Sequence, residues 1–243
     1  MHDDYRTRIY RNYATRFQDS GGVFDAAAAD RWGRAYDHYL RGWLPKHRKA
    51  RILDLACGGG ELLYFLKARG YLNICGVDIS PEQVKLSRQV IQEVHLGDAL
   101  EFLEARPLTF DLIIGLDILE HLHKKEVLRF LDLSFGSLCS KGRLLLQVPN
   151  TASAWGAGLM NNDFTHESHF SPNTLSRLIQ LSGFIHCETR EQGPIPWGYS
   201  LISSMRYFGW RCARTAWQFF NFIETGGFGQ GVYTRSFIIK GEK

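Results

Sequence analysis

The segment Arg51-Ile-Leu-Asp-Leu-Ala-Cys-Gly-Gly-Gly60 decides the fold of this chain. Its first half, Arg51–Ala56, is short and mostly apolar, which is typical of a buried strand. Glycines follow, and glycine lets the backbone turn sharply and approach a ligand closely. A helical pattern then runs over Glu61–Arg69 to Gly70, and the free N–H groups at its start would face the glycine turn. The segment therefore predicts a strand, a glycine-rich turn with a ligand site, and a helix.

The alternation of strand and helix continues along the chain. Further strands are predicted at Ile74–Val77, Glu93–Leu96, Phe110–Gly115 and Arg143–Val148. Runs such as Leu112-Ile113-Ile114 are apolar without alternation, as in strands that helices cover on both faces of a parallel sheet. We therefore predict an α/β protein with a Rossmann-like, doubly wound sheet.

Helical sequence flanks this core on both sides. Before it, helices are predicted over Tyr5–Phe17 and over Asp25–Leu44, where Pro45 ends the second. After it come a capped helix from Ser171 to Gly183, two closing strands at Phe184–Thr189 and Val232–Ile239, and an aromatic insert between those strands. A connection of that length needs a structure or a function of its own.

Acidic residues stand at the ends of successive predicted strands. Asp78 ends the second strand, 20 residues after Gly58, and Asp98 follows the third. The carboxyl ends of parallel strands form the ligand crevice of an open α/β sheet. A carboxylate after the second strand can accept hydrogen bonds from both ribose hydroxyls, and one after the third could contact an adenine amino group. The spacing indicates a ligand that contains adenosine.

A dinucleotide site would need a third glycine three residues after Gly60, where Leu63 stands. As a set, Ile52–Gly60, Gly76–Pro81, Gly97–Ala99 and Asp117-Ile-Leu-Glu-His121 resemble the class I S-adenosylmethionine-dependent methyltransferases. The resemblance covers residues 50–150. It implies a seven-stranded, mostly parallel sheet with an antiparallel last strand and helices on both faces, with N-terminal helices and a helical insert before the last strand.

The same resemblance implies the cofactor, S-adenosylmethionine, and the residues that bind it. Asp54 and the Leu116 backbone are expected at its methionine end, Gly58 and Gly60 against the cofactor, Asp78 at the ribose, Ile79 under the adenine, and Asp98 and Ala99 at the adenine edge. We predict one methyltransferase domain over residues 1–243, with a helical cap at 1–49, a cofactor-binding core at 50–150, and acceptor-side loops, the insert and closing strands at 151–243.

Three histidines are candidates for the acceptor side. A hydroxyl acceptor must lose its proton, usually to a histidine or a carboxylate. His121 follows the fourth strand, and His166 and His169 lie in the loop after the fifth. Each also has a structural interpretation, His121 at the start of a helix and the other two as polar loop residues.

A metal site is the alternative use of these side chains. Asp117, Glu120, His166 and His169 offer oxygen and imidazole ligands that suit a divalent ion. They lack the regular spacing of a known metal site, so we predict no metal.

The insert contains a predicted helix over Leu201–Glu224 with one apolar face, formed by Leu201, Met205, Phe208, Cys212, Ala216, Phe219 and Ile223. Arg206, Arg211 and Arg214 lie opposite. Two interpretations stay open. The helix packs on the sheet with a solvated basic rim, or it lies at a membrane surface and meets an anionic or lipid-linked acceptor. The insert is also loosely similar to bacterial methyltransferases that modify cell-surface polysaccharides and other sugars.

Composition limits the location and the partners. Five cysteines without a CxxC pair indicate a reducing compartment, and the net charge of +4 is mild. The basic run Lys46–Arg51 is interpreted as a solvated loop, so no nucleic-acid partner is expected. No uncharged apolar run of about 18 residues occurs. The chain is expected in the cytoplasm, either free or peripheral at the inner membrane surface.

The sequence thus predicts methyl transfer from S-adenosylmethionine to a hydroxyl oxygen of a sugar, glycan or other small acceptor. Two alternatives stay open. One is N- or C-methylation of a small metabolite such as an amine or a quinone precursor. The other is a non-catalytic, cofactor-binding partner protein.

Overall fold

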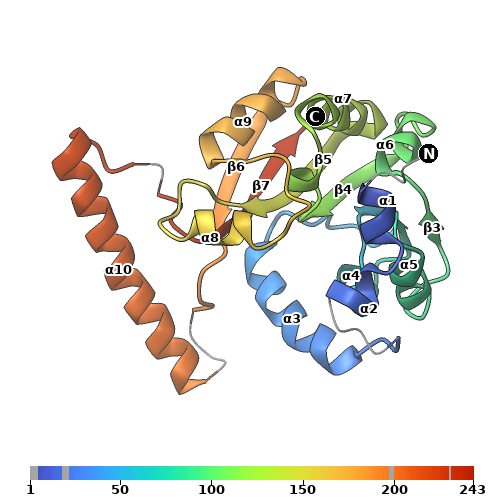
Figure 1. Ribbon diagram of the computed structural model, residues 1–243, viewed down its shortest axis with the longest axis horizontal. Helices are drawn as coiled ribbons and strands as arrows, with labels where there is room; N and C mark the ends of the chain where they lie inside the picture. Colours follow the sequence, from blue (N-terminus) through green and yellow to red (C-terminus); the bar gives the residue numbers. More distant parts are fainter. Residues whose placement is uncertain (1–4, 18–21, 197–199, 230) are drawn as a thin grey trace.

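A seven-stranded sheet forms the centre of the computed structural model, which describes residues 5–17, 22–196, 200–229 and 231–243 (Figure 1). The strand order is β3-β2-β1-β4-β5-β7-β6. The strands are β1 Arg51–Leu55, β2 Asn73–Asp78, β3 Val94–Leu96, β4 Phe110–Leu116, β5 Leu138–Pro149, β6 His186–Glu191 and β7 Ser236–Glu242. Only β7 runs antiparallel to its neighbours, β5 and β6. The predicted Rossmann-like fold is confirmed.

Helices cover both faces of the sheet (Figure 1). They are α1 Tyr5–Tyr10, α2 Tyr13–Phe17, α3 Ala26–Tyr39, α4 Glu61–Ala68, α5 Pro81–Ser87, α6 Ala99–Glu104, the 3₁₀ turn η1 Leu119–His121, α7 Lys124–Ser137, α8 Gly156–Asn161, α9 Pro172–Leu181 and α10 Leu201–Thr225. Side chains of α3 and α4 pack with Ile52 and Leu112 on one face, and those of α6, α7 and α9 pack with Leu53 and Ile113 on the other. Successive strand residues are therefore buried on opposite faces, which explains the uninterrupted apolar runs.

The predicted boundaries need small corrections. Tyr5–Phe17 forms the two short helices α1 and α2 rather than one, and α8 has no predicted counterpart. The closing strands β6 and β7 begin later than the sequence indicates. Phe184 and Val232 are buried outside the strands, so their apolar character reports core packing rather than strand pairing.

The long helix α10 stands beside the body of the chain and does not pack on the sheet (Figure 1). The predicted apolar face, which includes Met205, Phe208 and Phe219, is exposed. The opposite side faces the body, where Arg214 pairs with Glu191 and donates to the Gly231 carbonyl. The interpretation of α10 as a core-packed helix is therefore wrong. Among the described residues, no helix combines the length and apolarity needed to cross a membrane.

The junction of β2 with α4 tests the packing of this fold. A Cβ at Gly76 would lie 2.9 Å from both Cys57 Sγ and Leu63 Cδ1. We expect Gly76→Ala to lower the free energy of unfolding by about 1–3 kcal/mol, because overpacking displaces both neighbours. The control is Gly136→Ala on the exposed side of α7, where a Cβ meets nothing. It should raise stability by about 0.5–1 kcal/mol through helix propensity. Urea denaturation measures the free energy of unfolding of both variants. Equal free energies for the two variants would contradict the predicted overpacking at Gly76.

Candidate active site

A cavity of about 780 Å³ opens at the carboxyl ends of β1, β2 and β4. Seven of the eight residues predicted to bind the cofactor line it, namely Asp54, Gly58, Asp78, Ile79, Asp98, Ala99 and Leu116. The chain leaves β1 and β4 through Ala56 and Asp117, both at φ 55°. Non-glycine residues rarely adopt this conformation, and they do so where surrounding structure enforces it. The two sharp turns lead the chain away from the strand ends and leave the cavity between them.

The glycines of the turn have different positions. Gly58 has φ 53°, and a Cβ there would meet nothing within 4 Å, so its backbone borders the open cavity. Gly60 has φ 100° at the N-cap of α4, and a Cβ there would lie 3.0 Å from the Ser87 Cα in α5. Gly60 thus fits the start of α4 and its packing on α5, and it does not line the cavity.

Asp78 is held in place at the rim. Its Oδ2 accepts from the Gly58 N–H at 2.9 Å, and its Oδ1 accepts from the Ser80 N–H at 2.8 Å. Burial raises the pKa of Asp78, while hydrogen bonds from backbone N–H groups act in the opposite direction. The neighbouring Ile79 side chain is 46% exposed and presents an apolar surface to the cavity. A fixed carboxylate beside an apolar surface is suited to a ribose joined to a flat base.

Asp98 and Ala99 form the next part of this wall. Asp98 caps α6, and its Oδ1 accepts from the Leu100 and Glu101 N–H groups at 2.8 and 3.1 Å. The cap fixes the start of α6 against the cavity. Both predicted adenine-edge residues are thus presented by a helix start.

Asp54 is a buried carboxylate with one oxygen that has no partner among the described residues. It is 2% exposed, and its Oδ2 has no hydrogen bond from the described residues. Burial raises its pKa well above the usual range, and the charges of Asp78 and Glu61 add to this. A cationic ligand would relieve this cost, since an opposite charge favours the ionised form.

The whole cavity is acidic. Its carboxylates are Asp54, Glu61, Asp78, Asp98, Asp117, Glu120 and Asp163, whereas Arg6 is its one lysine or arginine among the described residues. S-adenosylmethionine carries a sulfonium and an ammonium group. The carboxylates that line the cavity, and the Asp54 oxygen without a hydrogen bond, therefore fit this cofactor.

A chain of contacts from aromatic rings through an amide to a carboxylate lies beside the end of β4. Gln147 Nε2 donates to Asp117 Oδ2 at 2.6 Å, and Tyr36 Oη donates to Gln147 Oε1 at 2.5 Å. Tyr36 stacks on Trp32 with ring centroids 3.6 Å apart. Sequence reasoning missed these residues. Their one local signal is the i, i+4 spacing of Trp32 and Tyr36 on α3, which predicts a shared face but not what it contacts.

His121 and His166 meet at the acceptor end of the cavity, with ring centroids 4.8 Å apart. The Thr165 hydroxyl donates to Asp163 Oδ1 at 2.6 Å, so its oxygen accepts from His121 Nδ1 at 2.8 Å. Burial, assisted by the nearby His166, lowers the pKa of His121 to about 4. His121 is therefore neutral near pH 7, with Nδ1 protonated.

The tautomer of neutral His166 is set by a carbonyl. Its Nδ1 lies 3.1 Å from the Met160 oxygen, which can only accept, so Nδ1 carries the hydrogen and Nε2 keeps its lone pair. The structure thus brings two of the three predicted histidines together. His169 is exposed and does not line the cavity.

The same cluster offers ligands for a metal. Ligand atoms of Glu120, His121 and His166 lie within 4.8 Å of one another. Glu120 is 1% exposed, its Oε2 has no partner among the described residues, and burial raises its pKa well above the usual range. Two imidazoles and a carboxylate could hold a divalent ion. This set shares Glu120 and His166 with the one considered from sequence, while His169 lies elsewhere.

The N-terminal helices close one side of the cavity, where Tyr10 and Tyr13 line it. Arg6 fixes α1 to the body: it donates to both Glu126 carboxylate oxygens at 2.9 and 2.8 Å and to the His121 carbonyl at 2.8 Å. Arg6 thus ties this cover to the histidine cluster. Nothing in the local sequence pairs Arg6 with residues more than a hundred positions away.

Comparison with known proteins agrees with this geometry. The family described as "Methyltransferase domain" matches residues 25–186, most of the chain. The chain belongs to this family. The membership in the S-adenosylmethionine-dependent methyltransferases that the sequence motifs predicted is thereby confirmed.

The curated relatives of this methyltransferase differ in length. The small RNA 2'-O-methyltransferase of Mus musculus is 30% identical over 46% of this chain and 32% of its own length. The ubiquinone biosynthesis O-methyltransferase of Xylella fastidiosa is 28% identical over 67% of this chain and 66% of its own length. The chain therefore matches less than two thirds of each of these relatives.

Solved structures share the fold. A SAM-dependent methyltransferase from Archaeoglobus fulgidus superposes with a TM-score of 0.64 at 20% identity, covering 95% of this chain and 98% of that one. A phosphoethanolamine N-methyltransferase of Haemonchus contortus, solved with S-adenosylhomocysteine, gives a TM-score of 0.61 at 16% identity, covering 96% of this chain and 60% of that one.

Asp78 provides the sharpest test of the cofactor site. We expect Asp78→Ala to weaken binding of S-adenosylmethionine and S-adenosylhomocysteine about tenfold or more, because hydrogen bonds to a charged group are lost. The matched control is Asp132→Ala on the exposed side of α7. Calorimetric titration of both variants measures the dissociation constants. Wild-type affinity in a folded Asp78→Ala variant would refute the ribose assignment.

Proposed function

We propose that this methyltransferase transfers the methyl group of S-adenosylmethionine to a hydroxyl oxygen of a sugar or other small acceptor. The observation that carries the proposal is the histidine cluster at the acceptor end of the cavity, in particular the lone pair on His166 Nε2. A hydroxyl acceptor needs such a base, because its own pKa is far above neutrality.

The residues of the cavity divide between the two substrates. When bound, S-adenosylmethionine supplies an activated methyl group on a positively charged sulfur. Asp54 and the Leu116 backbone would hold its methionine end and Asp78 its ribose, with Ile79, Asp98 and Ala99 around its adenine. The buried carboxylates would stabilise its positive charge, since low-dielectric surroundings strengthen such interactions.

On the acceptor side, the base is oriented from behind. The Met160 carbonyl holds His166 Nδ1–H, and the Thr165–Asp163 pair holds His121 beside it. In this arrangement His166 Nε2 takes the proton of the acceptor hydroxyl. The hydroxyl oxygen would then lie in line with the bond between the methyl group and the sulfur of the cofactor. Positioning of this kind is worth up to about 7–11 kcal/mol in favourable cases.

Two relatives support oxygen as the methylated atom, since the matched Mus musculus and Xylella fastidiosa proteins are both named O-methyltransferases. N- or C-methylation of a small metabolite is the alternative within enzymes. A non-catalytic partner protein is the alternative outside them. A neutral amine attacks with its own lone pair, and a non-catalytic protein transfers nothing, so neither of these needs an oriented base in the cavity.

Replacement of the two loop histidines distinguishes these functions. We expect His166→Asn to lower kcat about 100-fold or more with a hydroxyl acceptor, because the base is lost. His169→Asn, the matched control on the surface of the same loop, should stay within twofold. Release of S-adenosylhomocysteine with a panel of sugar, phenol and amine acceptors measures both rates.

Two outcomes would contradict the role of His166. Activity that survives His166→Asn would favour an amine or carbon acceptor. Activity lost to a chelator and restored by magnesium or manganese would mean that Glu120, His121 and His166 act as metal ligands instead.

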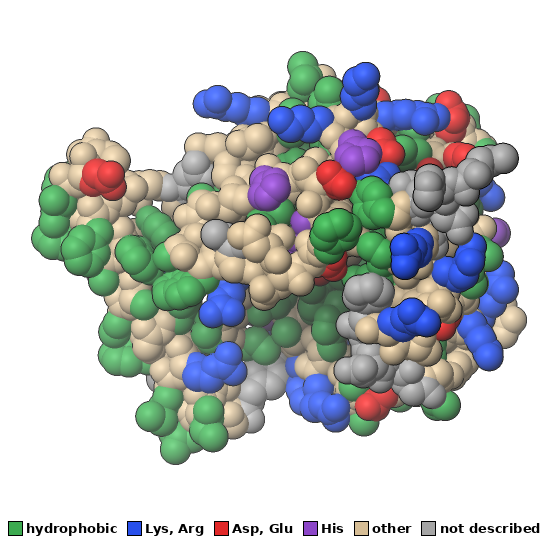
Figure 2. All heavy atoms as spheres, viewed as in Figure 1, with side chains coloured by type: hydrophobic (Ala, Val, Ile, Leu, Met, Phe, Trp, Pro, Cys, Tyr) green, Lys and Arg blue, Asp and Glu red, His purple; other side chains and the backbone are tan. Residues whose placement is uncertain are grey.

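We also propose that α10 holds the enzyme at the cytoplasmic surface of a membrane with anionic lipids. Figure 2 shows hydrophobic side chains gathered along this helix, and Phe208, Phe219 and Ile223 are 71%, 60% and 65% exposed. Arg211 of the same helix is exposed, and Glu224 is the one acidic residue of the helix. An exposed apolar face on a helix that carries several arginines and a single acidic residue is typical of an interfacial helix. The five free cysteines are consistent with a reducing compartment.

Vesicle co-sedimentation tests this location. Wild-type protein should bind vesicles of phosphatidylglycerol and phosphatidylcholine at low salt, with less binding as salt screens the arginines. The double variant Phe208→Ser with Phe219→Ser should bind about tenfold less tightly, because two large apolar groups are lost. Leu181→Ser, which removes an exposed leucine from the end of α9, is the control. No binding at low salt, or a dimer in solution that the same double variant breaks, would overturn the proposal.

A further inference from the structure

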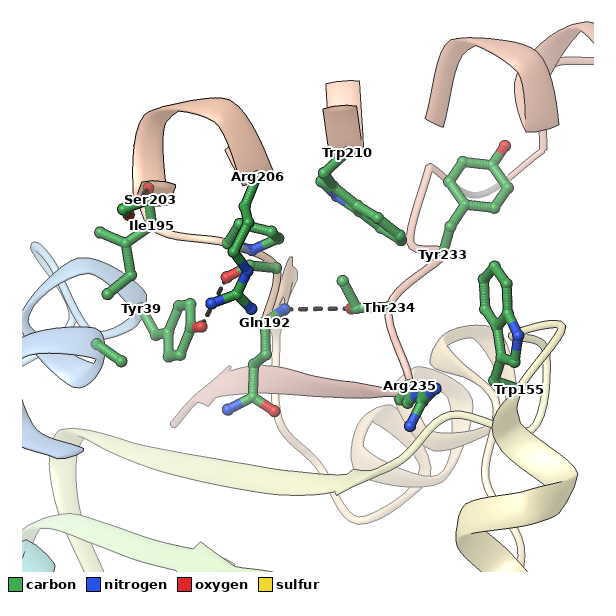
Figure 3. Close-up of a pocket in the computed structure, with 13 residues that line it drawn as sticks. Tyr39, Trp155, Gln192, Ile195, Ser203, Arg206, Trp210, Tyr233, Thr234 and Arg235 are labelled. Carbon is green, nitrogen blue, oxygen red and sulfur yellow. Dashed lines mark hydrogen bonds between the residues drawn. The ribbon is translucent and has the colours of Figure 1, made fainter. Parts of the chain in front are cut away.

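A second cavity, of about 580 Å³, lies between α10 and the sheet, separate from the cofactor cavity. Its walls come from the end of α3, the segment after β6, the first half of α10 and the residues before β7 (Figure 3). The cavity is lined by Trp155 from the loop before α8, by Trp210 and Arg206 from α10, and by Arg235 from the residues before β7 (Figure 3).

The charge of this cavity is opposite to that of the cofactor cavity. Arg206 and Arg235 line it, and no aspartate or glutamate among the described residues does. Neither arginine forms an ion pair within the described part of the chain, whereas nearby Arg190 and Arg214 pair with Glu188 and Glu191. Guanidinium groups bind phosphate and carboxylate strongly. Two uncompensated guanidinium groups at one cavity favour an anionic ligand.

The two arginines are carried on fixed backbone. The Arg235 carbonyl accepts from the Asn150 N–H at 2.7 Å, next to a hydrogen bond from Asn150 Nδ2 to the Thr234 carbonyl at 3.0 Å. Arg206 projects from α10 toward Tyr39, whose hydroxyl donates to the Gly193 carbonyl at 2.7 Å (Figure 3). The fold therefore fixes the backbone from which each of these two exposed side chains extends.

Aromatic rings form the remaining walls. Trp155, Trp210 and Tyr233 line the cavity, and the Trp210 indole nitrogen is buried without a hydrogen-bond partner in the described residues. Gln192 and Thr234 also line it, and the Thr234 hydroxyl accepts from the Gln192 N–H at 3.2 Å and donates to the Ser236 carbonyl at 2.6 Å. Flat rings beside two arginines suit an anionic ligand with an apolar face, which describes a sugar ring that carries a phosphate.

The two cavities are neighbours. Ala35 and Tyr39 of α3 line the second cavity, while Trp32 and Tyr36 of the same helix line the first. Gln192 donates to Gln147 Oε1, and Gln147 in turn donates to Asp117 in the cofactor cavity. At the start of β7, Arg235 lines the second cavity and the next residue, Ser236, lines the cofactor cavity. A ligand held in the second cavity is thus one layer of side chains from the first.

From these contacts we propose that the second cavity binds a sugar phosphate, with the phosphate between Arg206 and Arg235 and the sugar ring against the tryptophans. The inference goes beyond the proposed function, because this cavity shares no lining residue with the one proposed to hold the methyl donor. The phosphate could come from a soluble sugar phosphate or from a lipid-linked one, and the chemistry recognised is the same.

Calorimetry on the full chain saturated with S-adenosylhomocysteine tests the site. The probes are glucose 1-phosphate, its dodecyl phosphodiester, glucose and inorganic phosphate. We expect glucose 1-phosphate to bind, inorganic phosphate to bind more weakly, and glucose to show no binding. Arg206→Gln and Arg235→Gln should each weaken binding about tenfold or more, because a charge-assisted contact is lost. Arg211→Gln is the control, since this exposed arginine of α10 lines neither cavity.

The arms of this experiment separate the explanations. Tighter binding of the dodecyl ester than of glucose 1-phosphate would support the site and indicate a lipid-linked source, and the reverse order would support it with a soluble source. Glucose binding equal to that of its phosphate, or unchanged binding in both arginine variants, would overturn the proposal.

The readouts also keep this inference apart from the function proposed above. Affinity for S-adenosylhomocysteine should be unchanged in Arg206→Gln and Arg235→Gln, because neither arginine lines the cofactor cavity. If His166→Asn did not lower the rate, the role of His166 as general base would be refuted. The proposal that the second cavity binds a sugar phosphate would be unaffected. Loss of phosphate binding in the arginine variants would support the second cavity even then.

Discussion

The divergence of the chain at the ends of β1 and β4 is the constraint on which the rest of the structure depends. These strands are adjacent, but β1 leads through α4 to β2 on one side, and β4 leads through α7 to β5 on the other. Ligand crevices form where the strand order reverses in this way. Ala56 and Asp117, both in the left-handed region, turn the chain away at this point. The left-handed conformation costs conformational energy at both residues, and it is retained because it keeps the crevice open.

Buried charge follows from that crevice. Asp54, Asp117 and Glu120 are all raised in pKa by burial, and two of them have an oxygen without a partner in the described residues. Burying an ionised group costs several kcal/mol, as a rough magnitude, unless it is paired. A fold optimised for stability alone would replace such carboxylates with apolar residues. Their presence in one cavity is explained by a ligand whose positive charge compensates them.

The sequence predicted the strand ends well and the rest of the cavity poorly. Asp78 and Asp98 were predictable because parallel strands bring their carboxyl ends together, whatever the details of packing. Gly60 was expected at the cofactor. Its positive φ and its close approach to α5 explain why a glycine occupies this position without any contact with the cofactor. Tyr36 and Arg6 were not predictable as site residues, since α1 and α3 reach the cavity only through tertiary packing. Periodicity found the apolar face of α10 but could not tell whether it points inward.

The orientation of α10 links the two cavities to a location. One side of this helix supplies Arg206 and Trp210 to the second cavity, and the other exposes large apolar side chains. Contiguous apolar surface of this kind is rare on isolated soluble proteins and marks an interaction site. If the outer side lies on a membrane, the basic cavity opens beside the headgroup layer and the acidic cavity lies one layer deeper. An anionic ligand and the cationic methyl donor would then be drawn to separate sites by charge alone, which keeps each from occupying the site of the other.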